Sequence, residues 1–329
     1  MVKNTRRPEK SNKLLVGLLI FLIILLGIFV IIYLFYQNVP GSPINLNPVV
    51  VKAPVVQNQT YLEVLQFYPS MKFNHNLISY NMEDECSEEK RERMIEAFDT
   101  LSNLIKIVSF YEVVGESDIE VSCSGQEDIE EGEYFIAGEG GAREIISTGR
   151  YNIISNGMVI LHGNPHGFLE CDWANVELHE LIHVFGFDHS ENPNSLMYNL
   201  LESCDQELDD SIINELKRLY SQENLADLYL EDVKIVKKRR YIDFNLTVKN
   251  SGSIDAENVK VSVFDDGELI KSFDLEDDEG KIRYGAGIII SIENLKLKHS
   301  NPDEIQLVVD SDNFIEEIDE ENNIAKITF

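Results

Sequence analysis

Positive charge is scarce in this sequence of 329 residues, which has 28 Lys and Arg against 58 Asp and Glu and a formal net charge of −30. A surface with so few bases repels nucleic acids and other polyanions. We therefore exclude nucleic acid as a partner and expect a strongly solvated surface that tolerates cations and basic substrates. Hydrophobic residues still make up 43% of the chain, which is enough for globular domains with buried cores.

Charge of either sign is missing from residues 14–36, an apolar run of 23 residues. A helix of roughly 20 apolar residues is long enough to span a bilayer. The alternative is a cleaved signal peptide, whose apolar region is usually about 7–15 residues long and ends at small residues. Because this run is longer and is followed by QNVPGSP, we favour an uncleaved transmembrane anchor.

The charges that flank the apolar run indicate its orientation. Five bases and one acid precede the run, and no Lys or Arg follows it until Lys52. Loops rich in Lys and Arg stay in the cytoplasm. The sequence therefore predicts a single-pass protein of the cell membrane, with a cytoplasmic basic tail at residues 1–13 and everything after Tyr36 outside the cell.

Cysteine is also rare, and all four cysteines lie in the predicted outer part of the chain. An even number of cysteines in an oxidising compartment favours two disulfides. Four cysteines allow three pairings. We expect the pairing of nearest neighbours, Cys86–Cys123 and Cys171–Cys204.

The outer part divides by pattern into three segments. Residues 37–58 hold four of the nine prolines and no acid, which favours an extended stalk. In residues 59–222 short alternating runs, typical of strands, are interspersed with helical spacing at 87–106, 174–185 and 208–220. This mixture predicts an α+β domain. The glycine-rich stretch GEGGA at 138–142 predicts a turn or a bulge.

The pattern changes after about residue 226, where helical spacing and cysteine are both absent. Six or seven short alternating strands follow in about 100 residues. They predict an all-β sandwich of the immunoglobulin-like kind at residues 226–329.

Three of the seven histidines lie within eleven positions, in the stretch HELIHVFGFDHS at residues 179–190. His179 and His183 are four residues apart, so a helix places both rings on one face. Gly186 can take the positive φ that ends such a helix and turns the chain back. Because that turn would bring His189 to the same point, the pattern predicts a metal site with three histidine ligands.

Three neutral imidazoles leave the fourth position of a zinc ion open, which is the arrangement of a catalytic site. The ion would lower the pKa of water to about 7 and polarise a carbonyl group. Glu180 would take the proton of the water and pass it to the leaving nitrogen. The implied reaction is hydrolysis of an amide, most naturally a peptide bond. A closed structural zinc site, completed by Cys171 or Cys204, is the alternative.

The stretch HELIHVFGFDH resembles the extended zinc motif of the metzincin metallopeptidases. NSLMYNL at 194–200 resembles their turn with a methionine beneath the zinc, and Ser190 after the third histidine is typical of the matrixin branch. LDDSIINELKRLY at 208–220 resembles the closing helix of matrixin catalytic domains. The resemblance covers roughly residues 60–221 and implies a zinc metalloendopeptidase.

The resemblance also implies roles for single residues. Zinc would be bound by His179, His183 and His189, Glu180 would be the catalytic base, Gly186 would make the bend, and Met197, followed by Tyr198, would support the site by packing.

The sequence departs from the matrixin pattern in three places. No PRCGxPD-like segment of a cysteine-switch prodomain precedes the domain. The histidine–aspartate segment that holds a structural zinc in matrixins is missing, so we expect one zinc ion. Asn199 replaces the usual proline after Met-Tyr, so substrate preference cannot be carried over. Calcium is a further possible ligand of the acidic runs at 127–133, 275–280 and 316–322, although none has EF-hand spacing.

The C-terminal part has its own resemblance. NSGSIDAENVKVSVFDDGELI at 250–270 and VVDSDNFIEEIDEENN at 308–323 resemble the CARDB module, an immunoglobulin-like, cell-adhesion-related domain of bacterial and archaeal surface proteins. This resemblance implies a binding or spacer role and a possible surface ligand.

Together these features predict a membrane-anchored, extracellular zinc endopeptidase that acts on a protein or peptide substrate. Two alternatives stay open. One is a catalytically inactive surface adhesion protein with a structural zinc site, and the other is an enzyme that hydrolyses a non-protein amide such as a cell-wall link.

Overall fold

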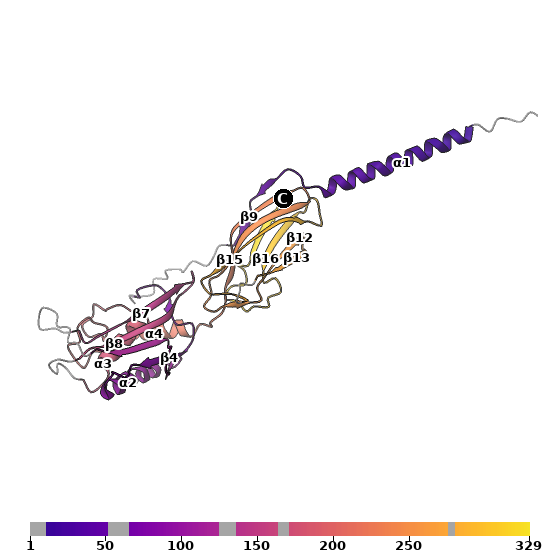
Figure 1. The fold of residues 1–329 in the computed structure, drawn as a ribbon. Helices are drawn as coiled ribbons and strands as arrows, with labels where there is room; N and C mark the ends of the chain where they lie inside the picture. The colour runs from indigo at the N-terminus through magenta and orange to yellow at the C-terminus, as the bar shows by residue number, and fades with distance from the viewer. Residues whose placement is uncertain (1–10, 52–65, 125–135, 164–170, 276–279) are drawn as a thin grey trace, which may run out of the picture.

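The structure is a computed structural model that describes residues 11–51, 66–124, 136–163, 171–275 and 280–329. It begins with the helix α1 (Ser11–Asn38), which leads to a β-sandwich, and an α+β domain lies beyond the sandwich (Figure 1). Within Leu15–Asn38 of α1, an 18-residue window has a mean hydropathy of 3.5, and none of that window is buried. This helix is long and apolar enough to be a membrane span or a signal sequence.

The α+β domain is built on a mixed sheet whose first strand begins at Met71. Its strands pair in the order β3-β8-β6-β4-β5, and β7 pairs with β8. All pairs along this order are parallel. The strand β7 runs antiparallel to β8. The elements of the domain are β3 (Met71–Lys72), β4 (Leu77–Met82), α2 (Glu88–Ile105), β5 (Ser109–Glu112), β6 (Ile119–Cys123), β7 (Gly138–Ser147), β8 (Asn152–Leu161), α3 (Asn175–Val184) and α4 (Asp210–Tyr220).

The helix α2 shows how the sequence pattern becomes structure. The Ser87 side chain accepts a hydrogen bond from the Lys90 amide at 3.3 Å, which caps the first turn. Lys106 ends the helix with a φ of +63°. The helix thus fits the predicted range of 87–106. Its buried face is apolar and is made of Met94, Ala97, Phe98, Leu101 and Ile105.

The glycine-rich stretch at 138–142 is part of the ten-residue strand β7 and makes no turn. The register of β7 against β8 shifts between Ala142 and Glu144 and again between Glu144 and Ile145, so a bulge follows the glycines. The glycines let helix α3 lie close against the strand. A Cβ at Gly140 would lie 2.1 Å from the carbonyl oxygen of Glu180. The expected turn is therefore wrong, and the expected bulge lies at the end of the stretch.

Two disulfides stabilise this domain, and both have the expected pairing of nearest neighbours. Cys86–Cys123 joins the residues before α2 to the end of β6, and Cys171–Cys204 joins the residues before α3 to a later loop. Each bridge closes a loop of more than 30 residues, 37 and 33 apart in sequence. Such bridges reduce the entropy of the unfolded chain.

The C-terminal domain is a sandwich of two antiparallel sheets. One sheet has the strand order β1-β9-β10-β15, and the other has the order β13-β12-β16-β17-β2. A small pair of β11 (Ala256–Glu257) and β14 (Lys281–Ile282) accompanies them. The bounds are β1 (Ile44–Leu46), β2 (Val49–Val50), β9 (Leu228–Lys238), β10 (Tyr241–Asn250), β12 (Lys260–Asp265), β13 (Glu268–Asp274), β15 (Gly287–Lys296), β16 (Glu304–Val309) and β17 (Ile324–Thr328).

The segment before the α+β domain belongs partly to this sandwich. β1 pairs with β9 and β2 pairs with β17, so residues 44–50 are extended but do not form a free stalk. Pairing satisfies backbone groups at the open edges of both sheets. Residues 52–58 of the predicted stalk lie outside the described residues.

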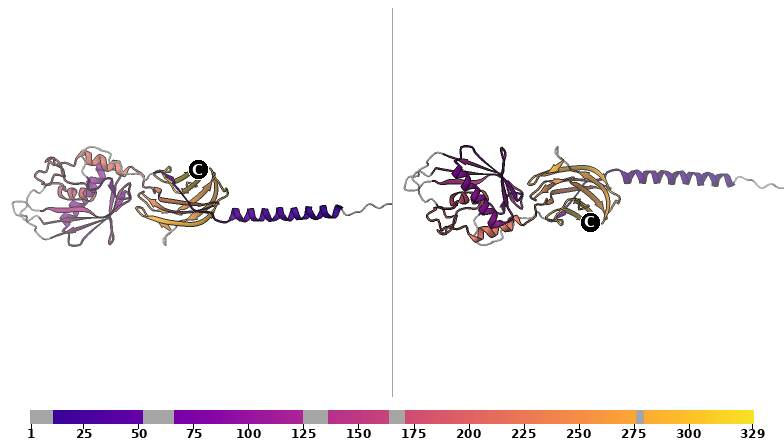
Figure 2. Two further views of the ribbon diagram at one scale, coloured as in Figure 1. Left: turned by 90° about the horizontal axis from the view of Figure 1, so that it is seen from above. Right: turned by 90° about the horizontal axis from the view of Figure 1, so that it is seen from below.

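The end of α1 contacts the same sandwich. The Arg239 guanidinium lies 3.8 Å from the ring centroid of Tyr36, and the Tyr241 hydroxyl donates a hydrogen bond to the Asn38 carbonyl at 2.9 Å. The sandwich therefore lies between the apolar helix and the α+β domain, which two further views also show (Figure 2).

Candidate metal centre

The helix α3 carries two of the predicted ligands into the interior of the α+β domain. His179 and His183 are one turn apart and both are buried. The helix stops at Gly186, whose φ is +86° and whose amide donates to the His183 carbonyl at 2.9 Å. A Cβ there would lie 2.5 Å from the Met71 sulfur, so both the backbone angle and the packing require glycine. The bend brings His189 back to the helix.

The three imidazole rings converge on one point. The Nε2 atom of His183 lies 3.0 Å from Nε2 of His179 and 3.2 Å from Nε2 of His189. On the other side of the rings, Nδ1 of His179 faces the Leu196 carbonyl at 2.6 Å and Nδ1 of His183 faces the Phe187 carbonyl at 2.7 Å. A carbonyl oxygen only accepts, so both Nδ1 atoms carry the proton and both Nε2 lone pairs point inward.

This donor set fits a zinc ion. The two inward lone pairs of His179 and His183 repel unless a cation lies between them, and Nε2 of His189 meets the same point. Ligand nitrogens 2.0–2.1 Å from a tetrahedral zinc are about 3.3 Å apart, close to the separations observed here. Burial, followed by the neighbouring His183, lowers the pKa of His179 to about 3, and burial likewise lowers the pKa of His183. Both rings are therefore neutral, as ligands must be.

Glu180 follows the first histidine and is buried between α3 and β7. A Cβ at Gly138 would lie 2.7 Å from the Glu180 Cγ atom, so the side chain lies against the β7 backbone. Burial, followed by the charges of Glu139 and Glu177, raises the pKa of this carboxyl to about 8. An ionised carboxylate in this place is a stronger base than an exposed one.

The turn after the third histidine contacts the chain at His179 and next to His189. Met197 is fully buried in the core of the domain, and its amide donates to the Ser195 hydroxyl at 3.0 Å. Its carbonyl accepts from the Ser190 amide at 2.7 Å, and Tyr198 forms a bridge with Ser190, the residue after His189. The turn thus lies against the chain on both sides of the metal centre.

Sequence reasoning missed the two carbonyl groups that orient the histidines, at Leu196 and Phe187. A backbone carbonyl is present at every position, so no residue type marks it. The methionine turn was the sequence feature closest to one of these carbonyls, because Leu196 directly precedes Met197.

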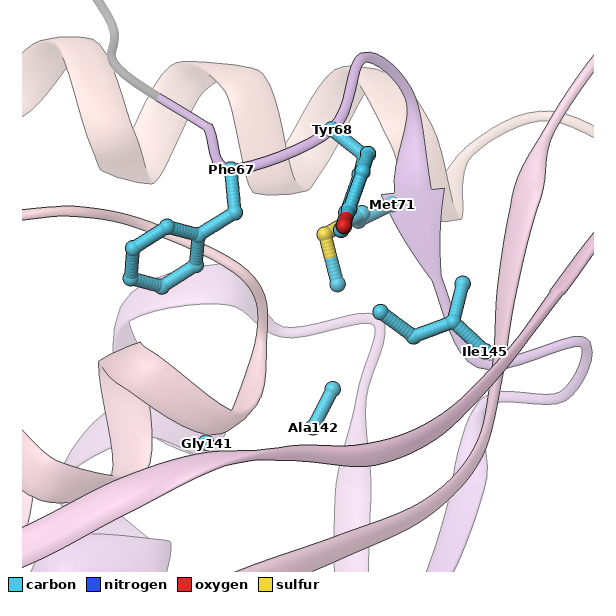
Figure 3. A pocket seen from close by; sticks show the side chains of 6 residues that line it. All are labelled: Phe67, Tyr68, Met71, Gly141, Ala142 and Ile145. Atoms are coloured by element: carbon cyan, nitrogen blue, oxygen red, sulfur yellow. The ribbon is translucent and has the colours of Figure 1, made fainter.

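An apolar cavity of about 340 Å³ lies beside the centre, between β7 and the segment before β3. Phe67, Tyr68 and Met71 line one side, and Gly141, Ala142 and Ile145 of β7 line the other (Figure 3). The Phe67 amide donates to the Gly186 carbonyl at 2.8 Å, and its ring centroid lies 6.2 Å from that of His183. One residue that lines the cavity, Phe67, therefore lies next to His183.

A second group of possible ligands lies in the sandwich, where Asp265, Asp266 and His299 have ligand atoms within 4.8 Å of one another. Asp265 accepts from the His299 amide at 2.8 Å. Asp266 accepts from the amides of Asp303 and Glu304 at 2.7 and 2.9 Å. These carboxylates already have backbone donors, so their positions are explained without a cation.

The acidic runs considered for calcium have different outcomes. Residues 127–133 and most of 275–280 lie outside the described residues. In the run 316–322, the described side chains form no group of metal-ligand geometry. Calcium stays a prediction from the sequence.

Comparisons with known proteins agree with this division of the chain. Residues 71–221 match the family model of the matrixins, and residues 225–326 match that of the CARDB family. A comparison with curated proteins gave no match.

Two solved structures match the C-terminal part. One is a crystal structure of the CARDB domain of the PF1109 protein from Pyrococcus furiosus in complex with di-metal ions. It is 21% identical, covers 31% of this chain and 85% of that chain, and has a TM-score of 0.25. The other is a solution NMR structure of the same domain, which is 22% identical, covers 32% and 93% of the two chains, and has a TM-score of 0.25. By the two family models, the chain carries a matrixin domain at residues 71–221, followed by a CARDB domain at residues 225–326.

Proposed function

We propose that this protein is a membrane-anchored zinc endopeptidase whose matrixin domain hydrolyses peptide bonds outside the cell. One observation carries the proposal. Three imidazole Nε2 atoms face one point, since Nε2 of His183 lies 3.0 Å from that of His179 and 3.2 Å from that of His189. The glutamate that follows His179 is buried on the same helix. The side chain of His189 is 47% exposed, so solvent and substrate can reach the centre.

In this proposal His179, His183 and His189 hold the zinc ion, which when bound lowers the pKa of water and polarises the substrate carbonyl. The Leu196 and Phe187 carbonyls keep two of the rings in the required tautomer. A Glu180 carboxylate oxygen takes a proton from the attacking water and delivers it to the leaving nitrogen.

The strand β7 would position the substrate. Among the described strands it pairs only with β8, so its outer edge can accept an extended peptide as a further strand. Gly138 and Gly140 lie against Glu180, which would place such a peptide beside the catalytic base. An apolar side chain of the substrate would fit the cavity formed by Phe67, Tyr68 and Ile145.

The helix α1 would anchor the protein. The bases before it favour a cytoplasmic N-terminus, so both domains would lie outside. Because the end of α1 contacts the CARDB domain at Arg239 and Tyr241, that domain would lie next to the membrane and the catalytic centre farther from it.

The test uses the full chain in detergent, with casein and a peptide library as substrates. We expect cleavage that a chelator abolishes and zinc restores. Glu180→Ala should lower the rate by about 100- to 10,000-fold while one zinc ion per chain is retained. The matched control is Glu191→Ala, because Glu191 is exposed on the nearby loop.

Two results would point elsewhere. Retained zinc without cleavage of any peptide by the wild type would favour a surface protein with a structural zinc site. Activity on cell-wall fragments alone would favour hydrolysis of a non-protein amide.

A further inference from the structure

The turn between β7 and β8 lies against the CARDB domain. Thr148 and Tyr151 of this turn are buried, although a hairpin turn is normally exposed to solvent. The Thr148 amide donates to the Tyr151 carbonyl at 2.9 Å, and Gly149 has a φ of +99°. The turn is therefore tight, and the neighbouring domain covers it.

Polar contacts join the turn to the CARDB domain. Nε of Arg150 donates to a carboxylate oxygen of Asp227 at 3.0 Å, and the Asp227 side chain is completely buried. The Thr148 hydroxyl donates to the Ser251 carbonyl at 2.8 Å. Asp227 also accepts from the Asn322 amide group at 3.0 Å, so the ion pair belongs to a buried network of the sandwich.

The backbones of the two domains also lie close together. A Cβ at Gly285 would lie 3.0 Å from the Ile146 Cγ2 atom and 3.1 Å from the Ser147 carbonyl oxygen. These two residues are the last of β7. The CARDB domain thus contacts both the turn and the end of the strand that leads into it.

The strand β7 connects this interface to the metal centre. Its first residues, Gly138 and Gly140, lie against Glu180, and its middle residues line the apolar cavity. Only β8 holds it laterally among the described strands, and its register shifts twice near Glu144. The packing of α3 against Gly138 and Gly140 holds the first residues of β7. An edge strand with a partner on one side only is less restrained where its register shifts, so the position of β7 beyond Glu144 depends also on what holds its end.

We propose that the CARDB domain is a positioning element of the peptidase. By holding the β7–β8 turn, chiefly through Arg150 and Asp227, it keeps the outer edge of β7 in place for the substrate. This inference rests on the proposed function where it concerns substrate, but its structural part, the restraint of β7, does not. Arg150 acts through β7 and is a positioning residue.

The experiment compares Arg150→Ala with the wild type as full chains. Removing Arg150 leaves the buried Asp227 carboxylate without its cationic partner, which weakens the interface. We expect amide hydrogen exchange in residues 138–147 to become at least about 10-fold faster. The KM for eight-residue peptides should rise about 5- to 10-fold, with kcat and zinc content within about 2-fold of the wild type.

Three further variants keep the test decisive. Arg150→Lys keeps a positive charge and should recover part of both effects. Thr148→Val removes the hydrogen bond to Ser251 and should act in the same direction if Arg150→Ala does not fold. Lys298→Ala removes a solvent-exposed ion pair with Glu268 and should leave exchange and KM unchanged.

Unchanged exchange in β7 together with an unchanged KM in Arg150→Ala and Thr148→Val would overturn the inference and make the CARDB domain a spacer. If the wild type cleaves no peptide, the proposed function fails. In that case faster exchange of β7 in the variants still supports the restraint, and unchanged exchange overturns it.

Discussion

The two domains bury polar side chains for different purposes. In the CARDB domain these side chains bond to one another or to the backbone, as where Asp227 accepts from Asn322 and Glu317 accepts from Asn323. In the matrixin domain His179 and His183 are equally buried, yet their Nε2 atoms face each other at 3.0 Å. When Nδ1 carries the proton, both Nε2 atoms are acceptors, so they cannot form a hydrogen bond with each other. Buried polar atoms thus indicate a ligand site where their lone pairs converge, and a structural network where donors meet acceptors.

The largest effect should come from removing a histidine of the metal centre, compared with removing a histidine of the CARDB domain, with zinc affinity as the measurement. His183→Ala removes the central ligand, so we expect zinc affinity to fall at least about 100-fold. His299→Ala alters the second possible group, in which the carboxylates already accept from backbone amides, and zinc affinity should not change. Equilibrium binding with a competing chelator measures both. If His299→Ala lost zinc and His183→Ala did not, the zinc site would lie in the CARDB domain, which would contradict the account.

The domains differ next in what stabilises them. All four cysteines are in the matrixin domain, so the double variant Cys171→Ala, Cys204→Ala should destabilise that domain by about 2–5 kcal/mol. Exchange in the CARDB strands should change much less. The fluorescence of Trp173 reports the first effect, because it is the only tryptophan and its indole donates to the Cys204 carbonyl at 3.0 Å. An equal loss of stability in both domains would contradict this expectation.

A smaller effect separates two adjacent glycines of β7. A Cβ at Gly140 would lie 2.1 Å from a backbone oxygen of α3, whereas a Cβ at Gly141 meets nothing within 4 Å. Gly140→Ala should therefore destabilise the matrixin domain by about 1–3 kcal/mol or more, and Gly141→Ala should change stability by less than about 0.5 kcal/mol. Denaturant unfolding of both variants checks the difference. Similar values for the two would show that β7 can move away from α3.

The smallest effect concerns pH and the CARDB domain. Burial raises the pKa of Glu317 from its ordinary 4.5 to about 8, although amide donors from Leu228 and Asn323 oppose the shift. The folded state then holds a proton that the unfolded state has lost, so stability should fall as the pH rises from about 5 to 8. Glu317→Gln should remove this slope. Exchange in β10 and β16 at several pH values measures it, and an unchanged slope in the variant would assign it to other groups.

The features that the sequence predicted are those encoded by local spacing. Helical periodicity marks α2, and the interval of four between His179 and His183 fixes their common face. The contribution of residues 44–50 to the sandwich was not predicted, because strands of two and three residues have no period to read. The contact between Arg150 and Asp227 was not predicted either, since it joins positions 77 residues apart. The glycines at 138–142 predicted a turn or a bulge, but their close packing against α3 was not predicted, because it depends on a helix that is distant in sequence.

The most direct test of the account is zinc X-ray absorption of the full chain, together with its metal content. We predict one zinc ion per chain with three imidazole nitrogens and one oxygen ligand at about 2.0–2.1 Å, and a loss of one nitrogen in His189→Ala. A sulfur ligand at about 2.3 Å, or a spectrum that His189→Ala leaves unchanged, would contradict an open site made by the three histidines.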